Sequence, residues 1–125
     1  MEAEQARKKA KQEIPMIVAF SVAPSGTPTD APAGTGGDAS VHTAVAAAVK
    51  VVRESGLPNH TSSMFTEIEG EWDEVMDVVK RATEAVGQYG SRVSLVLKAD
   101  IRPGHTGELS GKVARLEGAL DTMGE

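Results

Sequence analysis

Two glutamates two residues apart, Glu67 and Glu69, are the first candidates for chemistry in this sequence. They alternate with Thr66 and Ile68 in a strand-like segment, so both carboxylates are expected on one face of a strand. Such a pair can act as general acid and general base when the surroundings raise one pKa. Nothing in the neighbouring sequence would do so, and paired carboxylates also occur for structural reasons. We therefore expect a protein that is not an enzyme.

Other reactive residue types do not form a recognisable site. None of His42, His60 and His105 has a second metal ligand of the right type two, three or four residues later, so no metal site is expected. Cysteine is absent, which excludes disulfides and a thiolate nucleophile. No serine stands in a nucleophile elbow, and the glycine-rich stretch at 25–39 lacks the lysine and spacing of a phosphate-binding loop. We expect no cofactor.

The composition of the 125-residue chain is that of one globular domain, with 40% hydrophobic and 25% charged residues. A formal net charge of −5 argues against nonspecific nucleic-acid binding. No apolar run is long enough to span a membrane, and the N-terminus has no secretory signal pattern. We expect a cytoplasmic protein with a mobile N-terminal extension at 1–13 and a single domain at 14–125.

Hydrophobic periodicity predicts the elements that would position Glu67 and Glu69. Residues 40–55 have an apolar stripe of Val41, Val45, Ala48, Val49 and Val52, which predicts a helix. Further along the chain, Gly70 separates the two glutamates from a second, amphipathic helix. In order, we expect a strand at 14–24, a loop at 25–39, a helix at 40–55, two short strands within 60–70, a helix at 71–89, a strand at 92–102 and a last helix from residue 110. This order predicts an α+β, ferredoxin-like βαββαβ domain with an antiparallel sheet, helices on one face, and an additional C-terminal helix.

The helix-free face of that sheet is the second candidate feature. Strand alternation places apolar residues such as Ile17 and Val96 there, together with both glutamates. A face of this mixed character is too apolar to be left in water, so we expect another copy of the chain to cover it. Carboxylates in a pocket between the copies would suit a cationic or amino-bearing ligand.

Four segments together resemble the small thiamine-binding, YkoF-like family. They are IVAFSVAPSGT at 17–27, VHTAVAAAVKVVRESGL at 41–57, MFTEIEGEWDEVMDVVKRA at 64–82 and RVSLVLKADIRPG at 92–104. The resemblance implies a ferredoxin-like subunit that assembles face to face into a homodimer or homotetramer. It also implies non-catalytic binding of thiamine or its hydroxymethylpyrimidine part.

The resemblance also implies ligand-binding positions. They are Ser21, Thr66, Glu69, Lys98, Asp100 and Arg102. Ala19 stands where the family often has an acid, and the loop at 25–39 is longer than is usual in the family.

The chemistry of these residues suits thiamine, which has a cationic thiazolium ring and an aminopyrimidine. Glu69 could accept a hydrogen bond from the amine or offset the cation, and Ser21 or Thr66 could complete the hydrogen bonds of the ring. Lys98 and Arg102 would pair with acids across an interface or meet a phosphate. The alternative is an oligomeric structural or regulatory protein whose open face serves assembly only. An enzyme acting on a thiamine precursor is a third hypothesis, but it lacks a nucleophile or acid–base pair.

Overall fold

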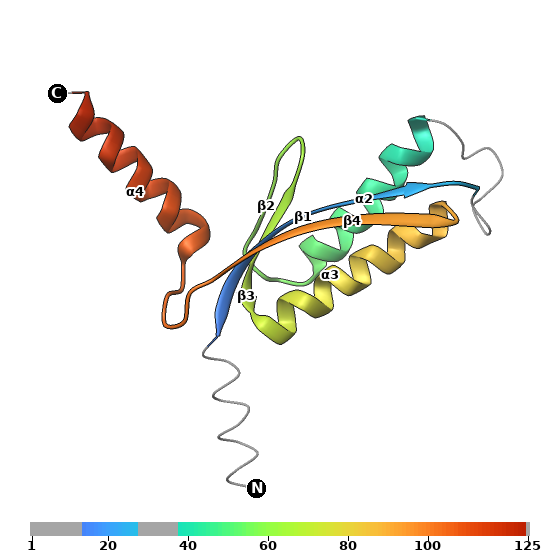
Figure 1. The fold of residues 1–125 in the computed structure, drawn as a ribbon, viewed down its shortest axis with the longest axis horizontal. Coiled ribbons are helices and arrows are strands. Elements are labelled where there is room, and N and C mark those ends of the chain that lie inside the picture. Colours follow the sequence, from blue (N-terminus) through green and yellow to red (C-terminus); the bar gives the residue numbers. More distant parts are fainter. Residues whose placement is uncertain (1–13, 28–37, 125) are drawn as a thin grey trace, which may run out of the picture.

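A four-stranded antiparallel sheet backed by two helices organises the chain, as Figure 1 shows for the computed structural model. The structure describes residues 14–27 and 38–124. The elements are β1 (Pro15–Ser25), α2 (Asp38–Glu54), β2 (Asn59–Thr61), β3 (Thr66–Glu71), α3 (Trp72–Val86), the 3-10 turn η1 (Gly87–Tyr89), β4 (Arg92–Ile101) and α4 (Glu108–Met123). The predicted mobile extension at 1–13 and most of the loop predicted at 25–39 lie outside the described residues.

The strand order is β2-β3-β1-β4, and the paired strands run antiparallel. β1 is central: it pairs with β3 over Pro15–Phe20 and with β4 over Met16–Ser25. This arrangement confirms the ferredoxin-like order predicted from the sequence, with α2 and α3 covering one face of the sheet.

The core lies between that face and the two helices. Val18 and Ile68 are opposite each other in the β1–β3 register and are fully buried. Gly70 lets α3 approach the sheet closely, because a Cβ atom there would lie 3.2 Å from a methyl of Val75 and 3.3 Å from Leu57. The strand β3 therefore passes into α3 without an intervening loop. Asp73 and Glu74 lie in the first turn of α3, where the positive end of the helix dipole stabilises their negative charges.

The predicted stripe of the first helix was wrong over its first half. Val41 and Val45 are 43% and 40% exposed, whereas Ala44, Ala48 and Val52 are buried. The small alanines allow α2 to pack closely on the sheet, which turns the two valines toward the margin of the core.

Coverage of the edge strand β4 is also incomplete. Strand alternation would put Leu95 and Ile101 on the helix side and in the core, but each is 43% exposed. The helices lie mainly over the central strands, so the margin of the sheet beside β4 extends beyond them.

The other face of the sheet, here called the outer face, contains the residues that strand alternation predicted. Ile17 is opposite Glu69 on one side and Asp100 on the other, and Ala19 is opposite Glu67 and Lys98 in the same way. Directly paired residues share a face, so these side chains form one continuous surface. Among the described residues, no helix is long and apolar enough to cross a membrane.

Candidate functional site

The C-terminal helix α4 meets the outer face through its first two turns and then projects away from the rest of the domain (Figure 1). It follows a turn in which Gly104 and Gly107 have φ angles of 81° and 68°. Such left-handed conformations favour glycine. The turn redirects the chain from the end of β4, so that α4 begins over β3.

Glu69 fixes the start of α4. One carboxylate oxygen accepts the backbone N–H of Glu108 at 2.7 Å, and the other accepts that of Leu109 at 3.3 Å. The first N–H groups of a helix lack partners within the helix, and the helix dipole favours a negative charge there. Glu69 is only 7% exposed, so its two oxygens serve as a buried cap for a helix that begins far along the sequence.

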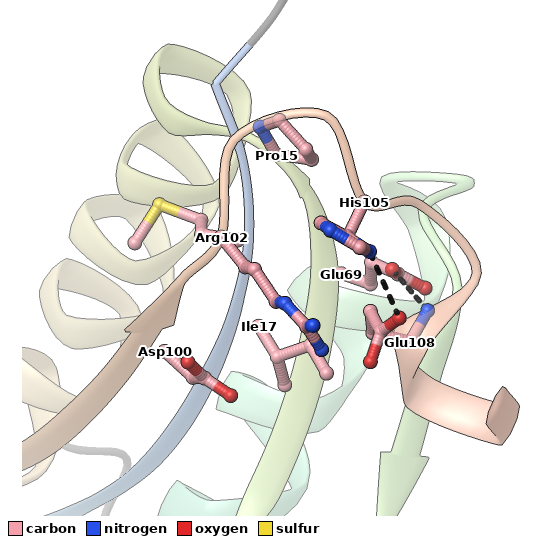
Figure 2. Close-up of a pocket in the computed structure, with 8 residues that line it drawn as sticks. Pro15, Ile17, Glu69, Asp100, Arg102, His105 and Glu108 are labelled. Carbon is pink, nitrogen blue, oxygen red and sulfur yellow. Dashed lines mark hydrogen bonds and ion pairs between the residues drawn. The ribbon is translucent and has the colours of Figure 1, made fainter. Parts of the chain in front are cut away.

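Side chains add further polar links at this junction. Glu108 forms an ion pair with Arg115 at 2.5 Å, and His105 Nδ1 lies 4.0 Å from the other oxygen of the same carboxylate (Figure 2). The hydrogen bond from Arg115 lowers the pKa of Glu108, against the opposing effect of burial. Lys112 of α4 forms an ion pair with Asp100 of β4, so α4 is held to the sheet at both β3 and β4.

A small cavity lies inside this junction. Figure 2 shows Asp100, Arg102, His105 and Glu108 around it, with Glu69 at its side. Its volume is about 10 Å³, which is room for about one water molecule. In this arrangement the cavity cannot take a thiamine ring.

A much larger hollow, here called the α4 cleft, lies between α4 and the β2–β3 side of the outer face. It has a volume of about 720 Å³. Its walls include His60 and Glu67 from the strands and Leu109 and Val113 from α4. A second hollow of about 210 Å³ lies over β1 and β4, and Lys98 and Asp100 line it. Glu67, Leu109 and Val113 line both.

Glu67 is the acid at the centre of these two hollows. Its side chain is half-buried, and within the described part of the chain it has neither a hydrogen-bond partner nor an ion-pair partner. Glu69, two residues later, is already occupied by the N–H groups of α4. An accessible carboxylate beside apolar Leu109 and Val113 can accept from an amine and offset a cation.

The structure divides the six positions implied by the resemblance among three places. Glu69, Lys98 and Asp100 are on the outer face, and Arg102 lies just beyond β4 at the small cavity. Thr66 is opposite buried Phe20 and so belongs to the helix-covered side, where it lines a different cavity together with Ser21. Lys112, rather than Lys98, is the described ion-pair partner of Asp100.

Sequence reasoning considered Glu67 only as one member of an acid pair. Its alternation with Glu69 already indicated that both share a face. What the sequence did not indicate is that α4 would occupy Glu69 and leave Glu67 accessible, because that distinction depends on where a helix forty residues later begins.

Known proteins of similar sequence support this fold and its family. A family model described as thiamine-binding protein matches residues 18–117. UPF0045 protein Mb1933 from Mycobacterium bovis is 50% identical over 103 residues, covering 82% of this chain and 91% of that protein. UPF0045 protein sll0230 from Synechocystis is 36% identical over 91 residues, covering 72% and 74% of the two chains.

Solved structures agree. The structure of a domain of unknown function, DUF77, from Bacillus cereus superposes with a TM-score of 0.60 at 31% identity, covering 75% of this chain and 84% of the other. A Thermotoga maritima protein for which a role in thiamine biosynthesis or salvage has been suggested gives a TM-score of 0.61 at 23% identity, covering 79% and 98%. The second likeness concerns the fold alone. By its match over most of its length, this chain belongs to the thiamine-binding protein family.

Proposed function

We propose that this chain is a cytoplasmic, non-catalytic binding protein for thiamine or its hydroxymethylpyrimidine moiety. The observation that carries the proposal is the half-buried, unpartnered carboxylate of Glu67 between the two hollows of the outer face, within the described residues. Family membership supports the choice of ligand. The volume of the α4 cleft is within the range of typical small-molecule sites, about 300–1,000 Å³.

The proposed contacts follow from the chemistry of the cleft. Glu67 accepts a hydrogen bond from the exocyclic amine of the pyrimidine or lies beside the thiazolium cation. Leu109 and Val113 offer apolar surface to the flat faces of the rings. Lys98 and Asp100, in the adjoining hollow, would contact the distal part of the ligand, and Lys98 suits a phosphate there.

Assembly into a homodimer or homotetramer is part of this proposal. The apolar stripe of α4 has no cover within the described chain: Val113, Leu116 and Leu120 are 56%, 58% and 52% exposed. The outer face also exposes Val96, by 56%. A second copy that packs against the outer face would cover both surfaces and close the hollows over a ligand.

Calorimetric titration with thiamine tests the binding proposal. Glu67→Gln keeps the shape of the side chain but removes its charge, and loss of a charge-assisted hydrogen bond should weaken binding about tenfold or more. Glu84→Gln is the matched control, because Glu84 is exposed on α3, away from the outer face. Oxythiamine, in which a carbonyl replaces the amine, should lose affinity for the wild type. Absence of heat at millimolar thiamine would overturn the proposal.

Assembly alone remains the second candidate function, favoured by the exposed stripe of α4. It predicts the same oligomer without any effect of thiamine on its stability. Thermal unfolding with and without thiamine separates the two functions, since a ligand that binds only the folded state raises the melting temperature.

A further inference from the structure

The helix α4 is attached to the rest of the domain only through its start. Glu108 is buried, and Leu109 and Gly111 are half-buried, but every residue from 112 to 124 is exposed. Within the described chain, the apolar stripe of α4 therefore packs against no core that would fix the helix to the sheet. Most helices in proteins depend on such packing. The contacts that hold α4 in place must lie in its first two turns.

The segment that joins β4 to α4 has the properties of a hinge. Its residues, 102–107, are all exposed. Gly104 and Gly107 have positive φ angles, and a Cβ atom at either position would meet no described atom within 4 Å beyond its chain neighbours. The hydrogen bond from the His105 N–H to the Arg102 carbonyl, at 3.1 Å, stays within the segment. Short segments of this kind absorb the changes in backbone angles when an element moves.

Two charged contacts bridge the hinge and hold α4 against the sheet. The Glu69 carboxylate of β3 accepts the N–H groups of Glu108 and Leu109 (Figure 2). About one turn further along α4, Lys112 forms an ion pair with Asp100 of β4. The two contacts lie on either side of the central strand β1, so together they fix both the position and the direction of the helix. We call them the α4 latch.

The α4 latch also maintains the α4 cleft. Leu109, Ser110 and Val113 of α4 form one wall of the cleft, and the strands contribute His60 and Glu67. The three wall residues of α4 lie beside or between the two latch contacts in sequence. Movement of α4 away from the sheet would therefore remove this wall. The cleft of about 720 Å³ exists only while α4 is latched.

The latch is strong enough to favour one arrangement and weak enough to open. The side chains of Lys112 and Asp100 are 47% and 45% exposed, and salt screens ion pairs that are this accessible. The cap at Glu69 is buried and is the stronger of the two contacts. Segments with few buried apolar contacts open locally at a lower free energy than the core does. Opening of α4 thus leaves the sheet and its two covering helices intact.

We propose that α4 is a movable wall of the α4 cleft and that the α4 latch controls access to Glu67. In the latched state the cleft has its apolar wall and takes up a ligand. In the open state α4 turns away about residues 102–107, and the ligand leaves. A ligand that contacts the wall stabilises the latched state, and the latch raises the affinity for the ligand in return. The identity of the ligand rests on the proposed function, whereas the latch can be tested without any ligand.

Distances between spin labels on α4 and α3 test the latch in the full chain by double electron–electron resonance. The sequence has no cysteine, so Met123→Cys and Glu84→Cys direct the labels to two exposed positions, the end of α4 and the rigid helix α3. An excess of unlabelled chain confines the measurement to distances within one chain. The latched protein should give a narrow distance distribution. Lys112→Asp places an acid against Asp100 and should broaden the distribution.

Exchange of the two charges provides the decisive comparison. Asp100→Lys alone should also broaden the distribution, whereas Asp100→Lys combined with Lys112→Asp should restore the narrow one, because the ion pair forms again. Lys80→Asp is the matched control, since it makes the same change of charge on an exposed residue of α3 and should have no effect. Distributions of equal width in all variants and in the wild type would overturn the latch.

Thiamine titration of the same variants tests whether the latch controls the site. Lys112→Asp should weaken binding about three- to tenfold, because only a fraction of the molecules would have the wall in place, and the exchanged pair should recover the affinity. A direct effect of charge would act in the opposite sense, since an added acid favours a cationic ligand.

The two measurements separate this inference from the proposed function. An open α4 in Lys112→Asp with unchanged thiamine affinity would overturn the control of access and leave the binding proposal standing. If the wild type does not bind thiamine, the proposed function fails, and the latch stands or falls by the spin-label distances alone.

Discussion

The Glu69 carboxylate accepts the backbone N–H of Glu108 at 2.7 Å across 39 positions of sequence. This bond joins the middle of the sheet to the start of α4, and the described residues do not bury the apolar stripe of the helix, which is exposed. The orientation of α4, and with it the shape of the α4 cleft, therefore depends on a buried polar contact. Glu69 acts as a positioning residue for α4, and Glu67 remains accessible.

Removal of the cap should loosen α4 before it affects the rest of the fold. Glu69→Ala leaves the N–H groups of Glu108 and Leu109 without their acceptors. Loss of a helix cap costs about 0.5–2 kcal/mol. We expect faster amide hydrogen exchange in α4, with exchange in α3 unchanged. Glu67→Gln is the control, and equal protection of α4 in Glu69→Ala and wild type would contradict the role of Glu69.

Acid should weaken the first turns of α4 through Glu108. Its pKa is lowered by Arg115, so the folded state holds the ionised carboxylate more firmly than the unfolded state does. The resulting stability is present above the usual glutamate pKa and is lost as pH falls through the lowered value. Helicity of α4, followed by chemical shifts of Glu108–Arg115, should therefore persist to a pH below 4.5 and then decline.

Arg115→Met tests the cause of that pH dependence. Without the guanidinium, the pKa of Glu108 should rise, and the decline should begin at higher pH. Arg81→Met is the control, since Arg81 pairs with Asp77 on α3 and lies outside the α4 junction. An unchanged pH profile in Arg115→Met would show that another group controls the first turns of α4.

Local patterns predicted the sheet well because strand alternation depends on a single buried face. Period-two spacing alone puts Val18 and Phe20 on one side of β1 and Ile17 and Ala19 on the other, and the structure has them on those sides. The order of the elements then left few topologies, and the ferredoxin-like one was confirmed.

Helix faces were less predictable. A valine next to the buried stripe of a helix looks the same in the sequence as a valine within the stripe. Val45 was expected in the core but is 40% exposed, while Ala44 is fully buried. Which of the two faces inward depends on how closely α2 approaches the sheet. That distance is a tertiary property, which the periodicity of one helix does not contain.

For the candidate site, the sequence predicted only which residues share the outer face of the sheet. The sequence placed Glu67, Glu69, Lys98 and Asp100 together, and the register agrees. The family resemblance grouped Thr66 with Glu69 as ligand-binding positions, although the strand alternation assigns Thr66 to the opposite side. The roles of the two glutamates depend on Gly107, whose left-handed conformation lets α4 begin over β3.

Gly70 should be intolerant of any side chain. Gly70→Ala introduces a Cβ atom 3.2 Å from Val75 and 3.3 Å from Leu57, closer than ordinary contact. Overpacking of this kind costs about 1–3 kcal/mol, which urea unfolding would record as a lower midpoint. Gly118→Ala is the control: apart from the backbone of α4 itself, no described atom lies within 4 Å of its Cβ position, and alanine there should stabilise the helix by about 0.5–1 kcal/mol. Equal stability of Gly70→Ala and wild type would contradict the close approach of α3.

The exposed stripe of α4 should determine the proposed oligomer. Leu116 and Leu120 are one turn apart on the same side of the helix and are more than half exposed. Leu116→Asp with Leu120→Asp places two charges on that side, and an apolar interface would not accept them without partners. Light scattering should then report a monomer where the wild type is a dimer or tetramer.

Thr122→Asp is the matched control for this change, because it adds a charge on the opposite side of α4, where residue 122 is also exposed. It should leave the oligomer intact. Thiamine affinity of the double variant gives a second measurement, since the proposed oligomer closes the hollows beside Glu67. A monomer that binds thiamine as tightly as the wild type would separate ligand binding from assembly. An unchanged oligomer in the double variant would instead require that the copies meet through a surface other than the stripe of α4.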